Sequence, residues 1–293
     1  MNARQLGALV LLGALWGVSY LFIRVAVPEL GPFVLMGCRV ALAVLALTLY
    51  AAAVRQLPKF NGRLRQFLIL GTVNSAIPFS LIATAEIELP ASLAAILNST
   101  TALFAAGVAA VWIGEALTAS KVAGLVLGVA GVAVLVGWTP LPLTGPVLLS
   151  ACAMLGASLS YALGGVYAKR TFEGVPGLTM AIGQQSGAAA TLLPLAAATV
   201  PERAPSTAAV FSVLAIALLS TTVAYLLYFY LIRSAGPTKT LTVTFLIPAF
   251  GLFFGAVFLG EPVGPGTFAG LGIILLSVAL VAEIRIGKTR IRA

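Results

Sequence analysis

Histidine and aspartate are both missing from this chain of 293 residues, and its 8 acidic residues are all glutamates. The missing residue types are the ones that most often serve as general bases, proton carriers and metal ligands. The glutamates fall near the ends of long apolar runs, so none stands beside a nucleophile or in a metal-ligand set. The sequence therefore argues against an intramembrane enzyme, and we expect neither a cofactor nor a metal.

Charge is also scarce. Only 9% of the residues are charged, 60% are hydrophobic, and the mean hydropathy is +1.10. A helix needs about 20 apolar residues to cross a bilayer, and charge-free runs of that length recur along the chain. The runs are apolar throughout and do not alternate with polar residues as barrel strands do. The composition thus predicts an all-α integral membrane protein in contact with the lipid bilayer.

Turn-forming clusters divide the apolar sequence into ten predicted membrane-spanning helices, with loops too short for a separate domain. One such cluster is Pro28-Glu29-Leu30-Gly31-Pro32, and another is Gly260-Glu261-Pro262. The predicted spans are 6–27, 32–53, 67–86, 90–112, 119–137, 144–166, 176–198, 208–232, 238–259 and 264–284.

A repeat joins the two halves of the chain. Residues 89–128 align with residues 235–274 at a constant offset of 146, with seven identities. They are Phe104/Phe250, Ala110/Ala256, Val111/Val257, Gly114/Gly260, Glu115/Glu261, Gly124/Gly270 and Leu125/Leu271. Five spans in each half force the second copy to cross the membrane in the opposite sense. We therefore expect two inverted five-helix repeats, residues 1–138 and 139–293.

Basic residues give the orientation, because they resist translocation across an energised membrane. A cytoplasmic N-terminus puts 14 of the 17 basic residues on the inner side and leaves Arg24, Arg39 and Arg203 toward the outside. We expect a multi-pass protein of a bacterial-type inner membrane with both termini cytoplasmic. The net charge of +9 is then a topology signal and does not indicate a surface for nucleic acid. The inner residues are Arg4, Arg55, Lys59, Arg63, Arg65, Lys121, Lys169, Arg170, Arg233, Lys239, Arg285, Lys288, Arg290 and Arg292.

Several motifs resemble one known family. Trp16-Gly17 lies in the first span, and Gly114-Glu115 and Gly260-Glu261 close the fourth and ninth spans. With the ten-span doubled plan, they make the chain similar to the EamA-type transporters of the drug/metabolite transporter superfamily. The resemblance implies a monomeric basket of two five-helix bundles around a central cavity. Within that family the aromatic, charge-poor interior resembles the YddG-type exporters of aromatic amino acids.

Polar and helix-breaking residues occur at matching depths in both halves, which indicates a substrate site at the interface of the repeats. Such residues can also serve only to join helices or to kink them. Predicted hinges are Pro78, Ser99, Thr100 and Pro248. Predicted substrate-binding residues, including deeply placed aromatic ones, are Trp16, Tyr20, Asn74, Ser75, Phe79, Asn98, Thr101, Tyr161, Gln184, Thr221, Tyr225 and Thr244.

Arg39 is the one basic residue well inside a predicted span. It could hold a substrate carboxylate or gate the outer mouth. Alternatively, it snorkels to the surface or pairs with a glutamate of the outer loops, Glu29, Glu86 or Glu88.

The function that fits these features is export or facilitated transport of small neutral or zwitterionic metabolites, above all aromatic and other apolar amino acids. Hydrophobic drugs remain an alternative, whereas phosphorylated substrates would need several buried basic residues. No glutamate falls at the middle of a span, so we expect transport by alternating access without ion coupling. Sodium binding by backbone carbonyls stays open as a coupled alternative.

Overall fold

The computed structural model describes residues 1–138 and 144–282, apart from the side chains of residues 237 and 238. Every regular element in these ranges is a helix. In chain order the helices are α1 (Ala3–Ala53), α2 (Leu64–Gly71), the π-helix η1 (Thr72–Ala76), α3 (Ile77–Ala85), α4 (Ala91–Asn98), α5 (Thr101–Ile113), α6 (Ala119–Gly137), α7 (Gly145–Thr171), α8 (Gly177–Ala198), α9 (Thr207–Ala217), the π-helix η2 (Leu218–Val223), α10 (Ala224–Ala235), α11 (Pro237–Thr240), α12 (Val243–Leu259) and α13 (Pro265–Val281).

Long apolar helices dominate this part of the chain. Six continuous helical segments are long and apolar enough to span a membrane, and α12 and α13 are shorter apolar helices. The described part of the chain is therefore all-helical, with helices suited to a membrane. The count of ten spans and their inverted pairing stay predictions. The predicted boundary between the halves and the end of the last predicted span lie outside the described residues, as do the four basic residues after position 284.

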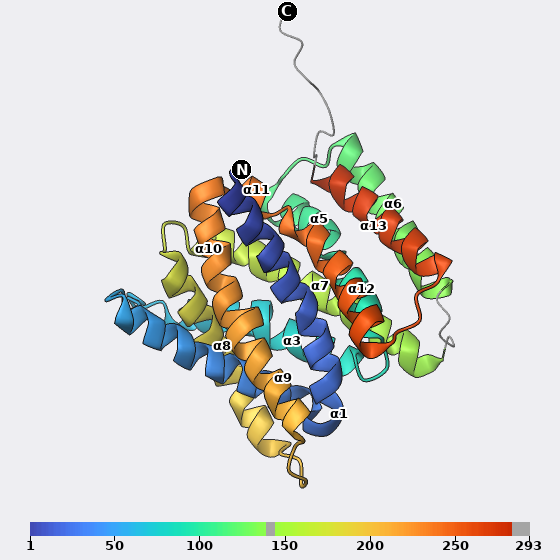
Figure 1. The fold of residues 1–293 in the computed structure, drawn as a ribbon. Helices are drawn as coiled ribbons and strands as arrows, with labels where there is room; N and C mark the ends of the chain where they lie inside the picture. Colours follow the sequence, from blue (N-terminus) through green and yellow to red (C-terminus); the bar gives the residue numbers. More distant parts are fainter. Residues whose placement is uncertain (139–143, 283–293) are drawn as a thin grey trace, which may run out of the picture.

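Helix α1 joins the first two predicted spans. Its helical geometry is broken at Gly31, which has a φ of +68° and a ψ of 165° and is followed directly by Pro32. A residue with a side chain adopts this φ only rarely, and proline cannot continue the hydrogen-bond ladder of a helix. The two arms of α1 consequently run in different directions from the bend (Figure 1).

The two π-helices occupy equivalent places in the halves, because Thr72 and Leu218 differ by the repeat offset of 146. Pro78 follows η1 and lacks the N–H that would complete the α-helical ladder there. The amide of Ile77 instead reaches back to the carbonyl of Thr72, one residue farther than in an α-helix. In η2, the hydroxyls of Thr221 and Thr222 donate to carbonyls five residues earlier. Single π turns of this kind frequently occur at functional sites.

Most large helix contacts join residues of the first half to residues of the second. Helix α1 packs against α8, α9 and α12, α2 against α8, α3 and α5 against α7, α4 against α12, and α6 against α13. The pairing of α6 with α13 is visible at one side of the molecule in Figure 1. Because helices of the two halves pack against each other in this way, a site between the halves is lined by residues of both.

Candidate substrate site

Arg39 lies inside the protein, with 6% of its surface exposed. Its Nε donates a hydrogen bond of 2.9 Å to Oγ1 of Thr221, and its Cζ lies 3.8 Å from the ring centroid of Phe79. The only other hydrogen-bond contact of the guanidinium among the described residues is a long one, 3.9 Å from Nη1 to the sulfur of Met36. Cation–π contact partly replaces the hydration that the guanidinium loses.

The expected alternatives for Arg39 do not hold. Its guanidinium does not snorkel to a surface, and within the described ranges the only ion pair is formed elsewhere, between Lys121 and Glu115. Glu29, one of the expected partners, accepts hydrogen bonds from Ser206. Arg39 is thus a buried cation with most of its five N–H donors uncommitted.

Polar groups from other helices lie around Arg39. Gln184 of α8 donates from Nε2 to Oγ of Ser75 in η1, at 2.8 Å, and to the hydroxyl of Tyr225 in α10, at 2.9 Å. Tyr161 of α7 meets Phe79 edge to face, with ring centroids 6.4 Å apart. Tyr161, Tyr225 and Tyr20 all lie near enough to Arg39 to interact with its charge.

Two buried amide oxygens at this place accept no hydrogen bond from the described residues, Oδ1 of Asn98 and Oε1 of Gln185. The Tyr20 hydroxyl lies beside the Asn98 side chain, and Gln185 approaches Ser75 and Tyr225. Unsatisfied buried acceptors are costly, so they mark places where a ligand donor fits. We call the whole set the Arg39 cluster: Tyr20, Arg39, Ser75, Phe79, Asn98, Tyr161, Gln184, Gln185, Thr221 and Tyr225.

Sequence reasoning missed Gln185. A signal was present, because Gln184 and Gln185 form an adjacent pair of amides inside a charge-free run, residues 174–201. Both side chains are buried, at 5% and 0% exposure. Two neighbouring amides can both turn inward only where a helix is surrounded by protein, as α8 is by α1 and α2.

Other predicted site residues lie apart from these contacts. Trp16 packs against Tyr228, with ring centroids 5.7 Å apart, and Asn74 lies against Gly164. The hydroxyls of Thr101 and Thr244 donate to carbonyls of their own preceding turns, those of Asn98 and Leu241. In this structure the hydroxyls of these two threonines therefore bond within their own helices.

The predicted hinges are placed differently in the two halves. The helix is interrupted at Ser99 and Thr100, between α4 and α5, and both hydroxyls bond to the preceding turn. Pro248, in contrast, lies inside continuous α12. The interruption in that region falls earlier, at residues 241 and 242, which separate α11 from α12. The hydroxyls of Thr242 and Thr244 donate there to the carbonyls of Lys239 and Leu241.

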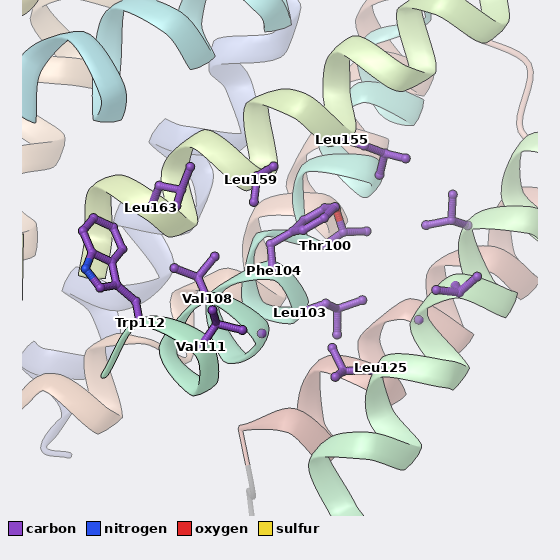
Figure 2. A pocket seen from close by; sticks show the side chains of 14 residues that line it. Thr100, Leu103, Phe104, Val108, Val111, Trp112, Leu125, Leu155, Leu159 and Leu163 are labelled. Carbon is purple, nitrogen blue, oxygen red and sulfur yellow. The ribbon is translucent and has the colours of Figure 1, made fainter. Parts of the chain in front are cut away.

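A cavity of about 770 Å³ lies between α5, α6 and α7 (Figure 2). None of the residues predicted to bind the substrate lines it, although the predicted hinge Thr100 does. It extends along α5 from Thr100 to Trp112, and Leu155 and Leu163 of α7 form another wall. Its full lining is Thr100, Leu103, Phe104, Gly107, Val108, Val111, Trp112, Leu125, Gly128, Val129, Val132, Leu155, Leu159 and Leu163.

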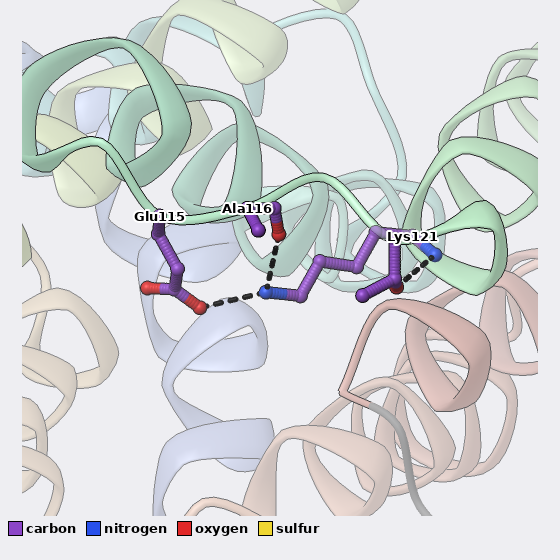
Figure 3. Close-up of polar contacts among 4 residues, drawn as sticks. Glu115, Ala116 and Lys121 are labelled. Carbon is purple, nitrogen blue, oxygen red and sulfur yellow. Dashed lines mark hydrogen bonds and ion pairs between the residues drawn. The ribbon is translucent and has the colours of Figure 1, made fainter.

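The mirrored glutamates have different partners. Glu261 accepts hydrogen bonds from the backbone amides of Ala91 and Ser92 at the start of α4, at 2.6 and 2.9 Å. Glu115 instead pairs with Lys121, 2.7 Å away, which also donates to the carbonyl of Ala116 (Figure 3). The hydrogen bond from Lys121 and then its charge lower the pKa of Glu115.

The preceding glycines do share one role. Gly114 and Gly260 end α5 and α12 in the left-handed region, with φ of +67° and +63°. Each glycine therefore caps the C-terminal end of its helix.

Comparison with known proteins places the chain in a family. The family model for the EamA-like transporter family matches residues 5–137 and again residues 148–282. The chain belongs to the EamA-like transporter family. Its function is therefore membrane transport, and a crystal structure with 19% identical residues shares the fold, with a TM-score of 0.67 over 96% of both chains.

This EamA-family chain is similar to several transporters, and each of the following matches covers most of both chains. It is 29% identical to the uncharacterized transporter YvbV of Bacillus subtilis over 281 residues, 93% of this chain and 90% of that one. It is 28% identical to the uncharacterized inner membrane transporter YedA of Escherichia coli, over 96% and 92%. A probable terminal-alkyne amino-acid exporter of Streptantibioticus cattleyicolor is 25% identical over 98% of this chain and 96% of its own.

Proposed function

We propose that this transporter moves small zwitterionic amino acids with aromatic or other apolar side chains, and that the Arg39 cluster binds them. The observation that carries the proposal is the buried guanidinium of Arg39, which has no carboxylate partner among the described residues. An unpaired buried charge is costly, and a substrate carboxylate would offset that cost through paired, charge-assisted hydrogen bonds.

The rest of the cluster complements the other parts of such a molecule. Asn98 Oδ1 and Gln185 Oε1 are buried acceptors without a donor, so an ammonium group would satisfy them. Phe79, Tyr161 and Tyr225 supply aromatic surface for an apolar side chain. One relative in the family is, by its name, an amino-acid exporter, which agrees with this substrate class.

On this proposal the cavity along α5 forms part of the substrate route, although no residue of the Arg39 cluster lines it. It begins at Thr100, two residues after Asn98, and ends near Trp112. The basic-residue bias assigns that second end to the cytoplasmic side. On this assignment the conformation is closed at the outer end, where Glu261 bonds to α4, and accessible from within.

The proposed mechanism is alternating access between two inverted repeats. The protein would act as a monomer in the inner membrane, with both termini in the cytoplasm. Rearrangement at residues 98–101 and at the interruption between α11 and α12 would open one end and close the other. The substrate gradient would set the direction, because the described glutamates lie at the bend of α1, at helix ends or in the connections between helices.

Hydrophobic drugs are a second candidate, favoured by the almost wholly apolar lining of the cavity. Uptake into proteoliposomes under a substrate gradient alone distinguishes amino-acid transport from drug transport. Phenylalanine, tryptophan, methionine, threonine and glutamate would be compared with a neutral aromatic compound. We expect phenylalanine and tryptophan to be transported best.

Variants connect that transport to the cluster. Asn98→Ala and Tyr225→Ala should each reduce phenylalanine uptake about tenfold, the effect of losing one or two hydrogen bonds to a charged ligand. Thr199→Ala is the matched control, since its exposed hydroxyl bonds to the carbonyl of Leu195 in its own turn, away from the cluster and the interruptions. Wild-type uptake in both cluster variants, or transport of the neutral compound alone, contradicts the proposal.

A further inference from the structure

Glu86 is an acidic side chain completely enclosed by protein. It caps the end of α3, has 0% of its surface exposed, and both carboxylate oxygens are buried without a hydrogen-bond partner in the described part of the chain. An ionised carboxylate in this position would lack hydrogen-bond donors and a paired cation among the described residues, which makes the ionised form unfavourable. Uptake of a proton removes the charge.

The charged and titratable groups facing Glu86 come from two places. Tyr20, Arg24 and Arg39 belong to α1, and Glu261 follows α12. Arg24 does not pair with the carboxylate, because its Nη1 donates to the backbone carbonyls of Glu86 and Ile87. Arg39 lies near enough to interact with Glu86 through its charge, but it donates no hydrogen bond to the carboxylate.

Glu261 adds a second carboxylate to the same region, and its position is fixed. Its two oxygens accept from the amides of Ala91 and Ser92, which are five and six residues after Glu86. Two nearby carboxylates disfavour simultaneous ionisation. Glu261 has donors for its charge and Glu86 has none among the described residues, so Glu86 is the one that carries the proton.

We propose that Glu86 is a proton-binding site that controls the end of the molecule where α4 begins: closing this end binds one proton, and opening it releases one. Opening separates Glu261 from α4 and lets water reach Glu86, whose carboxyl group then ionises and passes its proton to that water. Reclosure takes a proton back from the same side. No proton crosses the membrane, so this control is compatible with transport along the substrate gradient.

The direction of the pH effect follows from the proton count. The closed state holds one proton more than the open state, so low pH favours closure and high pH favours opening. For one proton, the closed-to-open equilibrium changes by up to about tenfold per pH unit. The proposal rests on alternating access but on no particular substrate.

Accessibility of a buried position reports this equilibrium without any substrate. Leu89 lies just after Glu86 and has 0% of its surface exposed. In the detergent-solubilised protein with Cys38 and Cys152 replaced by serine, Leu89→Cys would be labelled with a maleimide from about pH 5.5 to about pH 8. Dividing by the rate of Ala204→Cys in the same background, at an exposed position in the connection between α8 and α9, removes the intrinsic pH dependence of the reaction.

The normalised rate should rise by about tenfold or more over this range when Glu86 is present. Glu86→Gln mimics the protonated acid, so its rate should stay low at every pH. Glu88→Gln, a change of an exposed glutamate two residues away, should keep the rise. A flat profile in the protein with Glu86, or a rise that persists in Glu86→Gln, overturns the proposal. Neither outcome bears on whether the Arg39 cluster binds amino acids, so the two proposals fail separately.

Discussion

Glu115 and Glu261 occupy equivalent positions in the two halves, but their different contacts give them different contributions to stability. Glu261 holds two backbone amides in a partly buried place, and charge-assisted hydrogen bonds of this kind are among the stronger ones in proteins. The side chain of Glu115 is 47% exposed, and its bond to Lys121 is a surface ion pair. Such pairs contribute little to stability.

The two glutamates should therefore respond differently to the same change. Glu261→Gln should lower the free energy of unfolding by about 1–3 kcal/mol, because an amide at the start of α4 loses its charged acceptor. Glu115→Gln should lower it by less than about 1 kcal/mol. Melting of both variants in detergent at neutral pH measures the difference, and equal losses would show that the contact of Glu261 is not the stronger one.

The lowered pKa of Glu115 gives a pH signature for the smaller effect. Its contribution is present above the ordinary carboxyl pKa and disappears as the pH falls through the lowered value. The difference between Glu115→Gln and the wild-type protein should accordingly vanish in acid.

Sequence reasoning identified most of the Arg39 cluster because polar residues in apolar spans are rare, and their positions repeat in the two halves. It misjudged the surroundings of Arg39, since the partner Thr221 is 182 positions away and nothing local indicates that contact. It also gave Glu86 no role in the interior. Glu86 lies at a helix end, where sequence patterns suggest exposure, and only the packing of α1 and the segment after α12 encloses it.

Close helix contacts are set by glycines that face a neighbouring backbone. A Cβ at Gly71, the last residue of α2, would collide with the backbone nitrogen of Ala188 in α8. A Cβ at Gly165 of α7 would have no atom within 4 Å. The two glycines therefore differ in what a methyl group would meet.

Gly71→Ala should lower the free energy of unfolding by about 1–3 kcal/mol, because α2 and α8 must separate to admit the methyl group. Gly165→Ala should be neutral or stabilising by up to about 1 kcal/mol, since alanine favours the helix. Thermal melting of the two variants in the same detergent provides the comparison. If the Gly71→Ala protein is as stable as Gly165→Ala, α2 and α8 can separate at little cost in free energy.

Helix irregularities were only partly predictable. Pro78 marks the π-helix η1 because it removes a backbone donor, and the repeat then indicates the equivalent place in η2. Pro248 does not interrupt its helix in this conformation, and its role as a hinge stays a prediction. A proline can sit within a helix when neighbouring groups accommodate the missing bond, and α12 continues through it between α1 and α4.

At the level of the complete chain, the two halves interlock around a buried cation. Helix pairs from different halves surround Arg39, and the family model matches residues 5–137 and then residues 148–282. The sequence predicted the fold class from composition alone. It could not predict that the cavity would lie along α5, apart from the polar cluster, because cavities depend on how far helices separate.

The most direct test of the account is binding of matched ligands to the purified protein, with calorimetry as the readout. Phenylalanine would be compared with phenethylamine, which keeps the ring and the ammonium but lacks the carboxylate. In the wild-type protein, loss of the carboxylate should weaken binding by about tenfold or more, as expected for a charged hydrogen-bonded pair. Arg39→Gln should bind both ligands weakly and with similar affinity. If Arg39→Gln still prefers phenylalanine by the wild-type factor, Arg39 does not hold the substrate carboxylate and the account is contradicted.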